Sequence, residues 1–161
     1  MKYGFCTGFA SIPLWDIQGS MLARIRDAGF DYAELPVMSL ADMEPCVFGS
    51  VLGGFRAPVA CNLFPGRIPL VSLERNLDVV RGYLDVALSR AVSLGIGKIV
   101  FGSGKARSYD ASSMSFDVAM ERLKETVSCV VVPKAREDGV TIPREPLKRG
   151  ESNLINTVEE G

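Results

Sequence analysis

Short apolar segments alternate with longer amphipathic segments along the chain, and this alternation constrains the fold more than any other feature. Five segments are predicted to be strands, at residues 2–6, 31–35, 59–63, 98–101 and 140–142. Each is followed by a helix or the start of one, in repeats of about 30 residues that are typical of βα units. Because such units pair their strands in parallel, the sequence predicts an α/β protein, either an open doubly wound sheet or a closed (β/α)8 barrel.

Apolar residues at helical spacing predict the helices between these strands. The clearest helix is expected over residues 73–94, with Gly95 at its end. Other helices are expected over residues 15–28 with Gly29 as the stop, from residue 40 with Ser39 as the N-cap, over residues 117–139 with Pro133 as a kink, and from residue 153 to residue 160.

The 161 residues contain no histidine, and this excludes several kinds of catalytic and metal site. Ser/His and Cys/His nucleophile pairs, histidine zinc sites and imidazole general bases all need this residue. Any chemistry must therefore use carboxylates, Lys, Arg, hydroxyls, thiols or backbone groups. The formal net charge of -1 also argues against a nucleic-acid-binding protein, which usually carries a basic excess.

Targeting signals and cysteine usage both indicate a cytoplasmic protein. The N-terminal segment lacks the apolar core of a signal peptide, and no stretch approaches the length of a membrane-spanning helix. The four cysteines are too widely spaced for a disulfide framework or a structural zinc motif. Cys6, Cys61 and Cys129 lie in apolar segments, so we expect them to be reduced residues of the core.

Polar residues gather just after the predicted strand ends, at the edge where parallel α/β folds place their active sites. They are Thr7, Glu34, Asn62, Ser103, Lys105, Arg107 and Glu145. Glu145, with Glu151 six residues later, could hold a divalent metal ion or act as a general base, or it could be a solvated loop acid. Segment 102–108 offers backbone N–H groups and cationic side chains, which suit an anion, a phosphate or sugar hydroxyls, or it could form a flexible surface turn.

Four segments together resemble the sugar phosphate isomerase/epimerase family. They are DYAELP at residues 31–36, CNLFP at 61–65, YLDVALSRAVSLGIGKIVFGSGKARS at 83–108 and EPLKRGESNLINTVEEG at 145–161. The family consists of xylose isomerase-like TIM barrels, which include ketose 3-epimerases and hydroxypyruvate isomerase and are distantly related to endonuclease IV. The resemblance implies that residues 1–161 form a single TIM-barrel domain that is incomplete at the C-terminus, with about five of the eight βα units.

The resemblance also implies a chemistry and a set of site residues. Family members hold a divalent metal ion (Mn, Mg or Co) with two Glu, one Asp and one His, and the first of these Glu falls on Glu145. A sugar-contacting Glu falls on Glu151, whereas Glu34 and Asn62 match positions that line the pocket. The implied reaction is proton transfer next to a carbonyl of a sugar or sugar phosphate, through an enediolate whose oxygens the metal stabilises.

Two departures from the family's motif affect this expectation. Lys148 stands where the motif has Asn, and Pro143 with Arg144 replaces the apolar pair that precedes Glu145. Because proline removes a hydrogen bond from a central strand, we expect the fifth strand to be distorted at its end.

The expected activity is therefore limited, and alternatives stay open. The family's remaining metal ligands come from strands six to eight, so we expect this chain to be inactive alone. Its exposed sheet edges predict a homo-oligomer, most simply a dimer. The alternatives are a non-catalytic half-barrel module for binding or assembly and, less favoured, an AP-endonuclease-like metal-dependent hydrolase.

Overall fold

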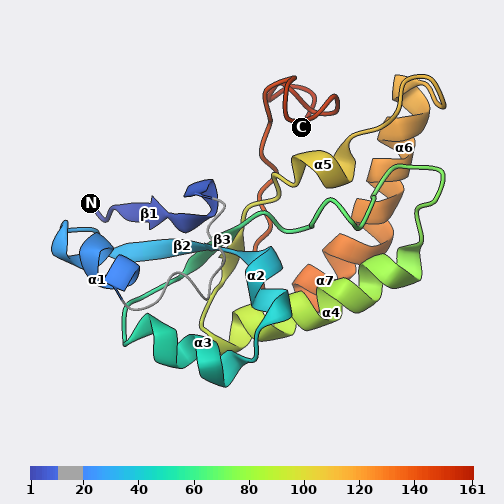
Figure 1. Ribbon diagram of the computed structural model, residues 1–161. Coiled ribbons are helices and arrows are strands. Elements are labelled where there is room, and N and C mark those ends of the chain that lie inside the picture. The colour runs from blue at the N-terminus through green and yellow to red at the C-terminus, as the bar shows by residue number, and fades with distance from the viewer. Residues whose placement is uncertain (11–19) are drawn as a thin grey trace.

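A parallel sheet of four strands forms the centre of the fold (Figure 1). The computed structural model describes residues 1–10 and 20–161. The strands are β1 (Gly4–Cys6), β2 (Tyr32–Pro36), β3 (Val59–Cys61) and β4 (Lys98–Ile99). They lie side by side in sequence order and every neighbouring pair is parallel, which confirms the predicted βα pattern. Sequence order is also the order that successive crossovers of one hand produce in a (β/α)8 barrel.

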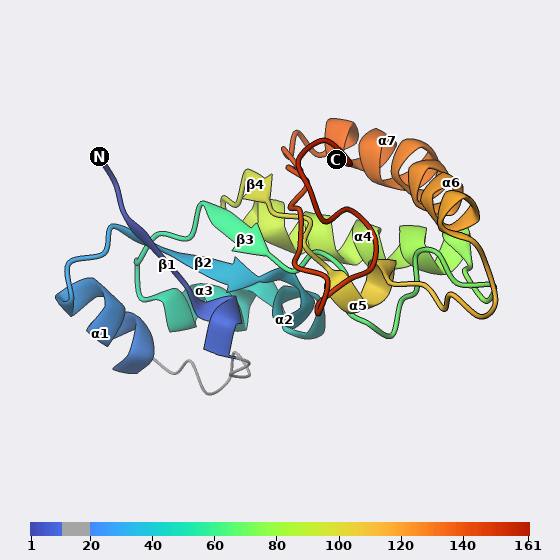
Figure 2. The same ribbon diagram turned by 90° about the horizontal axis from the view of Figure 1, so that it is seen from above.

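Helices follow the strands and cover one side of the sheet. Up to β4 they are the 3-10 turn η1 (Thr7–Ala10), α1 (Ser20–Asp27), α2 (Val37–Asp42), α3 (Pro45–Leu52) and α4 (Leu77–Ser93). After β4 come α5 (Gly104–Arg107), α6 (Phe116–Thr126), the π-helical segment η2 (Val127–Val131) and α7 (Val132–Glu137). Helices α2, α3 and α4 lie on the same side of the strands in both views (Figures 1 and 2). No helix in the described part of the chain is long and apolar enough to cross a membrane.

Successive residues of a strand point to opposite faces of the sheet, and β2 shows this most clearly. Ala33 and Leu35 are fully buried in the core that the sheet shares with the helices. Glu34 lies between them and points to the other face. The parallel register places Cys6 and Cys61 on the same face as Glu34. The face opposite the helices therefore carries the carboxylate of Glu34 and the thiols of Cys6 and Cys61.

The same alternation continues from β4 into the fifth predicted strand. Lys98 pairs with Val59 on one side and with Thr141 on the other. These paired residues form one row across the sheet, level with Glu34. Gly102 lies four residues after Lys98 and Glu145 four residues after Thr141, so both belong to the face of the sheet that carries Glu34. In a closed barrel, this face would be the interior.

The fifth predicted strand pairs with β4 through isolated bridges rather than a continuous ladder. Thr141 and Glu145 donate their backbone N–H groups to carbonyls that flank β4, at 3.0 and 3.3 Å. Pro143 lies between them and has no N–H, so it cannot donate the intervening bond. The predicted distortion is confirmed, and its cause is one missing donor.

Helix α4 begins at Leu77, about one turn later than predicted. Asn76 caps it: its side-chain oxygen accepts bonds from the N–H groups of Asp78 at 2.9 Å and Val79 at 3.2 Å. The predicted C-terminal stop is confirmed, because Gly95 has a left-handed φ of 76° that glycine adopts without strain. The apolar spacing thus indicated the helix, and the cap decided its first residue.

Residues 116–137 form one continuous helical segment through Pro133, as predicted. A proline inside an α-helix cannot donate its own bond, and its ring crowds the carbonyl one turn earlier. Directly before Pro133, the N–H of Val132 donates to the carbonyl of Val127, which widens the turn into η2. The helix therefore accommodates the proline through a π-bulge.

Two predicted helix boundaries are wrong. Helix α2 starts directly after β2 with Pro36 at the N-cap position, so Ser39 lies inside the helix rather than capping it. Residues 153–160 form turns rather than a helix, and Ile155 has a φ of 57°, outside the right-handed region. The helix expected over residues 15–28 is present as α1 from Ser20, and its earlier part lies outside the described residues.

The three cysteines are free, as predicted, but the predicted burial is correct for one of them. Cys61 is buried at the end of β3, whereas Cys6 and Cys129 are exposed. Cys6 belongs to β1, which ends the strand order and, within the described part of the chain, has one neighbouring strand. Cys129 lies on the solvent side of η2, where an apolar sequence context does not imply burial.

Asn76→Ala should lower the free energy of unfolding by about 1 kcal/mol, because two N–H groups of the first turn of α4 lose their acceptor. Asn76→Asp is the matched control, since it keeps an acceptor and should leave the stability nearly unchanged. Urea unfolding followed by circular dichroism measures both variants. An equal loss in the two variants would contradict the capping role.

Candidate functional site

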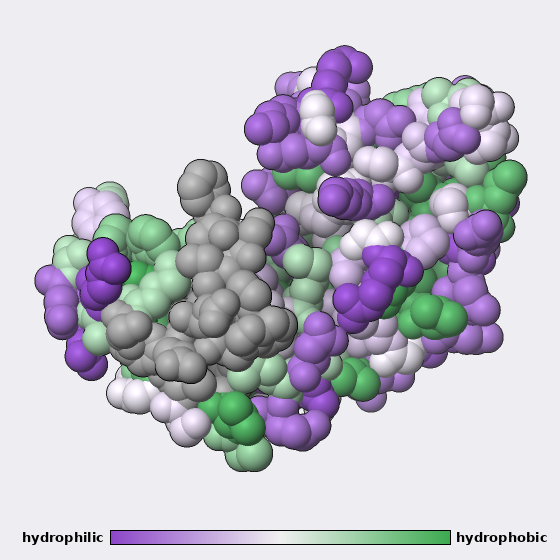
Figure 3. Space-filling view, in the orientation of Figure 1, coloured by the Kyte–Doolittle hydropathy of each residue, from purple (hydrophilic) through white to green (hydrophobic). Residues whose placement is uncertain are grey.

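An open cavity of about 780 Å³ lies at the carboxyl ends of the strands. Its size is within the range of small-molecule sites, which is about 300–1,000 Å³. The eight polar candidates from the sequence divide into two that do not line it, Thr7 and Arg107, and six that do: Glu34, Asn62, Ser103, Lys105, Glu145 and Glu151. Glu145, Leu147, Gly150 and Glu151 line one side of it, and the surface over the C-terminal loop is mainly hydrophilic (Figure 3). The structure thus brings together polar residues that are more than a hundred positions apart in the sequence.

The carboxylate of Glu145 lies against the end of β4, next to Gly102. A Cβ atom at position 102 would come within 2.6 Å of Glu145 Oε2. The missing side chain therefore leaves the space that the carboxylate occupies. Sequence analysis did not identify this role of Gly102, because the glycine was interpreted only as part of a polar loop.

Arg107 lies behind the cavity wall rather than in the cavity, which corrects the expectation that it contacts a substrate. It is fully buried in α5. Its guanidinium donates to the backbone carbonyls of Glu145 at 2.8 Å, Ile155 at 3.4 Å and Phe101 at 3.5 Å. Burial lowers the pKa of Arg107 below its usual value, and the charge of Glu145 opposes this shift. Arg107 therefore positions the backbone that carries Glu145.

Asn62 and Ser103 follow β3 and β4 with left-handed backbones, at φ values of 53° and 49°. Such values cost energy for residues other than glycine and concentrate at functional sites. The Ser103 hydroxyl accepts a bond from the N–H of Phe64 at 2.8 Å, which ties the loop after β3 to the start of α5. Segment 102–108 consequently contains the short helix α5 and is held by a buried bond.

Glu151 and Lys105 complete the exposed rim of the cavity. Lys148, the residue that departs from the family motif, contacts Glu151 at 3.1 Å. Both side chains of this pair are largely exposed, so the pair stabilises the fold by about 1 kcal/mol at most and can open to admit a ligand. Lys105 supplies a cation at the same rim.

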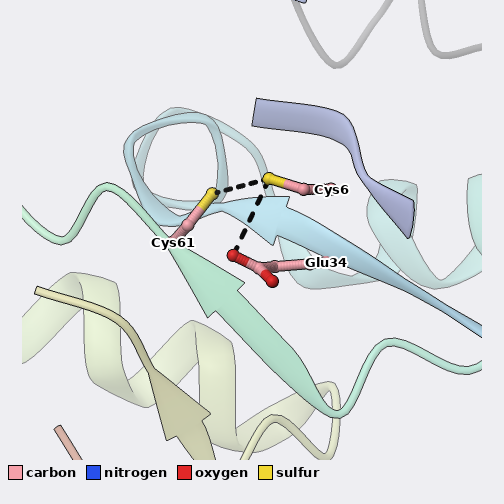
Figure 4. Close-up of side chains that lie close together, drawn as sticks. All are labelled: Cys6, Glu34 and Cys61. Atoms are coloured by element: carbon pink, nitrogen blue, oxygen red, sulfur yellow. Dashed lines mark hydrogen bonds between the residues drawn. The ribbon is translucent and has the colours of Figure 1, made fainter. Parts of the chain in front are cut away.

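Cys6, Glu34 and Cys61 point toward one another from β1, β2 and β3 (Figure 4). The Cys6 sulfur lies 3.7 Å from Glu34 Oε1 and 3.7 Å from the Cys61 sulfur. Burial, together with Cys6 and Glu34 nearby, raises the pKa of the Cys61 thiol above its ordinary value. Sequence analysis assigned the cysteines to the core, so it did not identify this cluster.

The chemistry of Glu145 fits a divalent cation of the Mn or Mg type. Its carboxylate is a hard oxygen donor, lines the cavity and extends from the end of a strand. A magnesium-like ion takes about six oxygen ligands, so one carboxylate alone holds it weakly.

Several solved structures share this fold. A D-psicose 3-epimerase in the presence of D-fructose matches with a TM-score of 0.78 and 20% identity over 100% of this chain. A 3-keto-D-glucoside 4-epimerase from E. coli matches with a TM-score of 0.74 and 20% identity over 99%. A family 2 AP endonuclease from Brucella melitensis matches with a TM-score of 0.67 and 18% identity over 98%.

These structures are all xylose isomerase-like TIM barrels. The chain has the fold of part of such a barrel. It spans 57%, 61% and 60% of the three matched chains, respectively. In this TIM-barrel fold the candidate cavity lies at the carboxyl ends of the strands, the face that carries the active site in barrel enzymes. No family model and no curated protein matches the sequence.

Arg107→Met should lower the free energy of unfolding by about 2–4 kcal/mol, because three backbone carbonyls lose a buried charged donor. Lys105→Met, on an exposed position of the same helix, is the matched control and should change the stability by less than about 0.5 kcal/mol. Chemical denaturation measures both. A similar small effect in the two variants would show that Arg107 does not hold this backbone.

Proposed function

We propose that the chain contributes the first five βα units of a sugar or sugar phosphate isomerase or epimerase, as one barrel domain over residues 1–161. The observation that carries the proposal is the convergence of six predicted polar residues on one cavity at the carboxyl ends of the strands. The fold shared with two sugar epimerases supports the same class. The shared fold is an observation, whereas the activity of the chain is proposed.

In this proposal, Glu145 is the group that moves a proton at the carbon next to the sugar carbonyl. Its carboxylate lines the cavity, and Arg107 holds its backbone through a bond of 2.8 Å. A positioned carboxylate can act as a general base or acid when the substrate proton is within hydrogen-bond reach. Glu34, Asn62 and Glu151 would bind the sugar hydroxyls, and Lys105 would bind a phosphate where the substrate carries one.

A divalent Mn, Mg or Co ion, when bound, would stabilise negative charge on the substrate oxygens. Glu145 is the residue of this chain that would contribute a ligand to it. The resemblance implies further ligands, including a histidine, and the 161 residues contain no histidine. We therefore propose that the chain binds a sugar but does not turn it over alone.

Two other functions compete with this proposal. A non-catalytic binding module would use the same cavity without any metal ion, and the weak single-carboxylate site favours it. An AP-endonuclease-like hydrolase is supported by the fold shared with the Brucella enzyme, but the net charge of -1 counts against tight binding to DNA.

A binding and exchange experiment distinguishes these functions. D-fructose is titrated into the chain in D2O with Mn²⁺ for the exchange assay, and with Mg²⁺ for ligand-observed NMR. We expect saturable binding that Glu151→Gln weakens about tenfold, because a charge-assisted hydrogen bond contributes about 1.5–3 kcal/mol. Glu121→Gln, an equal change of charge on the exposed face of α6, should bind normally. No deuterium should enter the sugar at C3.

Each outcome has a defined meaning. No sugar binding, with abasic duplex DNA bound at low salt, would replace the proposal with the hydrolase. Sugar binding that ignores both the metal ion and Glu145→Gln would favour the binding module. Deuterium incorporation at C3 would contradict the proposed inactivity, and its loss in Glu145→Gln would assign the proton transfer to that residue.

The proposal also includes a cytoplasmic homodimer. β1 and the fifth segment are the two ends of the described sheet, and strand edges offer unpaired backbone groups to a partner. Sedimentation velocity should therefore show a species of twice the chain mass at micromolar concentration. A monomer at all concentrations would contradict the dimer without affecting the sugar site.

A further inference from the structure

Three potential metal ligands meet at the ends of β1, β2 and β3. One ligand atom each from Cys6, Glu34 and Cys61 lies within 4.8 Å of the other two. Figure 4 shows the three side chains directed toward a common point. The parallel register is the cause, because it sets all three positions on one face of the sheet, with Cys6 level with Glu34 and Cys61 two residues further along its strand. The cluster is therefore part of the fold and does not depend on a flexible loop.

The spacing of the ligand atoms matches a tetrahedral zinc site. Zinc–sulfur bonds of about 2.3 Å at a tetrahedral angle separate two sulfur ligands by about 3.8 Å, and a sulfur and an oxygen ligand by about 3.5 Å. The observed distance between the Cys6 and Cys61 sulfurs is 3.7 Å. The distance from the Cys6 sulfur to Glu34 Oε1 is also 3.7 Å. Little rearrangement is needed for the three atoms to share one ion.

A disulfide between Cys6 and Cys61 fits the fold less well. Their strands lie on either side of β2, and two inter-strand spacings amount to about 9 Å. The Cα atoms of a disulfide are usually within about 7 Å of each other, so this bond would need a shift of the backbone. A metal ion bridges the same two sulfurs without bringing them closer.

We propose that Cys6, Glu34 and Cys61 form a binding site for a thiophilic divalent cation, Zn²⁺ above all. Thiolates select zinc over the hard cations that carboxylates prefer, so this site differs in chemistry from Glu145. Three protein ligands leave a fourth position for water, as in zinc sites with an open coordination place. The site adjoins the candidate sugar cavity, because all three residues also line that cavity.

Charge balance supports the same occupant. Three acidic groups at this spacing repel one another when ionised, and burial adds to the cost for Cys61. A divalent cation removes both penalties, because it neutralises the ligands it deprotonates. Gly8 permits the arrangement sterically, since a Cβ at that position would lie 2.6 Å from the Cys61 sulfur.

Cobalt titration of the metal-free, reduced chain tests the proposal, because Co²⁺ replaces Zn²⁺ and absorbs strongly in the near ultraviolet when sulfur is a ligand. We expect this sulfur-to-cobalt band to saturate at one ion per chain and to disappear when Zn²⁺ is added. Cys6→Ser should weaken cobalt binding by more than about 100-fold, because loss of even an outer partner of a metal ligand costs about 10–100-fold.

Matched variants identify the ligands. Cys46→Ser and Cys129→Ser remove exposed cysteines outside the cluster and should leave the titration unchanged. Glu34→Gln should weaken binding while the sulfur band persists, and Glu145→Gln should have no effect on the band. Cys6 is exposed, so its variant should fold normally even if Cys61→Ser does not, and circular dichroism checks this.

Two results would overturn the proposal. One is a titration of the unaltered chain without a sulfur band. The other is a sulfur-to-cobalt band that persists at full strength in Cys6→Ser, or one that Cys46→Ser and Cys129→Ser abolish as completely as Cys6→Ser does. Neither result depends on sugar binding, so the cation site and the proposed function fail separately.

Discussion

Burial of one face of the parallel sheet under helices is the constraint on which the rest of the structure depends. Ala33 and Leu35 are fully buried in the core shared with the helices. Each fully buried leucine contributes about 1.5–3 kcal/mol, which fixes the register, because a shift by one residue would exchange the two faces. Glu34, Cys61 and Glu145 are consequently directed away from the core. The cavity and the thiol cluster follow from this alternation.

The end of the sheet near Glu145 is maintained by backbone contacts rather than by strand pairing. Pro143 removes one bond between β4 and the fifth segment, and that segment pairs only through isolated bridges. Arg107 compensates from the adjacent helix by binding the carbonyls of Phe101, Glu145 and Ile155. The sequence predicted that Arg107 binds a substrate. Its guanidinium instead holds the backbone of Glu145, the candidate catalytic residue.

Two kinds of ligand chemistry lie in one cavity. Glu145 and Glu151 offer hard oxygen donors on the C-terminal side, whereas Cys6 and Cys61 offer sulfur beside Glu34 on the N-terminal side. A hard cation would therefore bind on the C-terminal side, and a thiophilic cation on the N-terminal side. An ion at the thiol cluster would also neutralise Glu34, a proposed sugar-binding residue, so occupancy of one side would affect the other.

The sequence by itself determined the class of fold and most of the cavity. Strand and helix periodicities repeat locally, and polar residues after parallel strands meet at one edge whatever the details of packing. The effect of Pro143 was also predictable, because the missing N–H is a property of the residue.

Only the tertiary structure decided the role of Arg107 and the grouping of Cys6 with Cys61. Each depends on contacts between distant segments: Arg107 reaches carbonyls as far away as Ile155, and the two cysteines meet across β2. Local apolar context cannot predict burial at a sheet end, where the strand order decides which side chains are covered. The alternation of the strands is thus encoded locally, and the partners of each side chain arise from the pairing of the whole sheet.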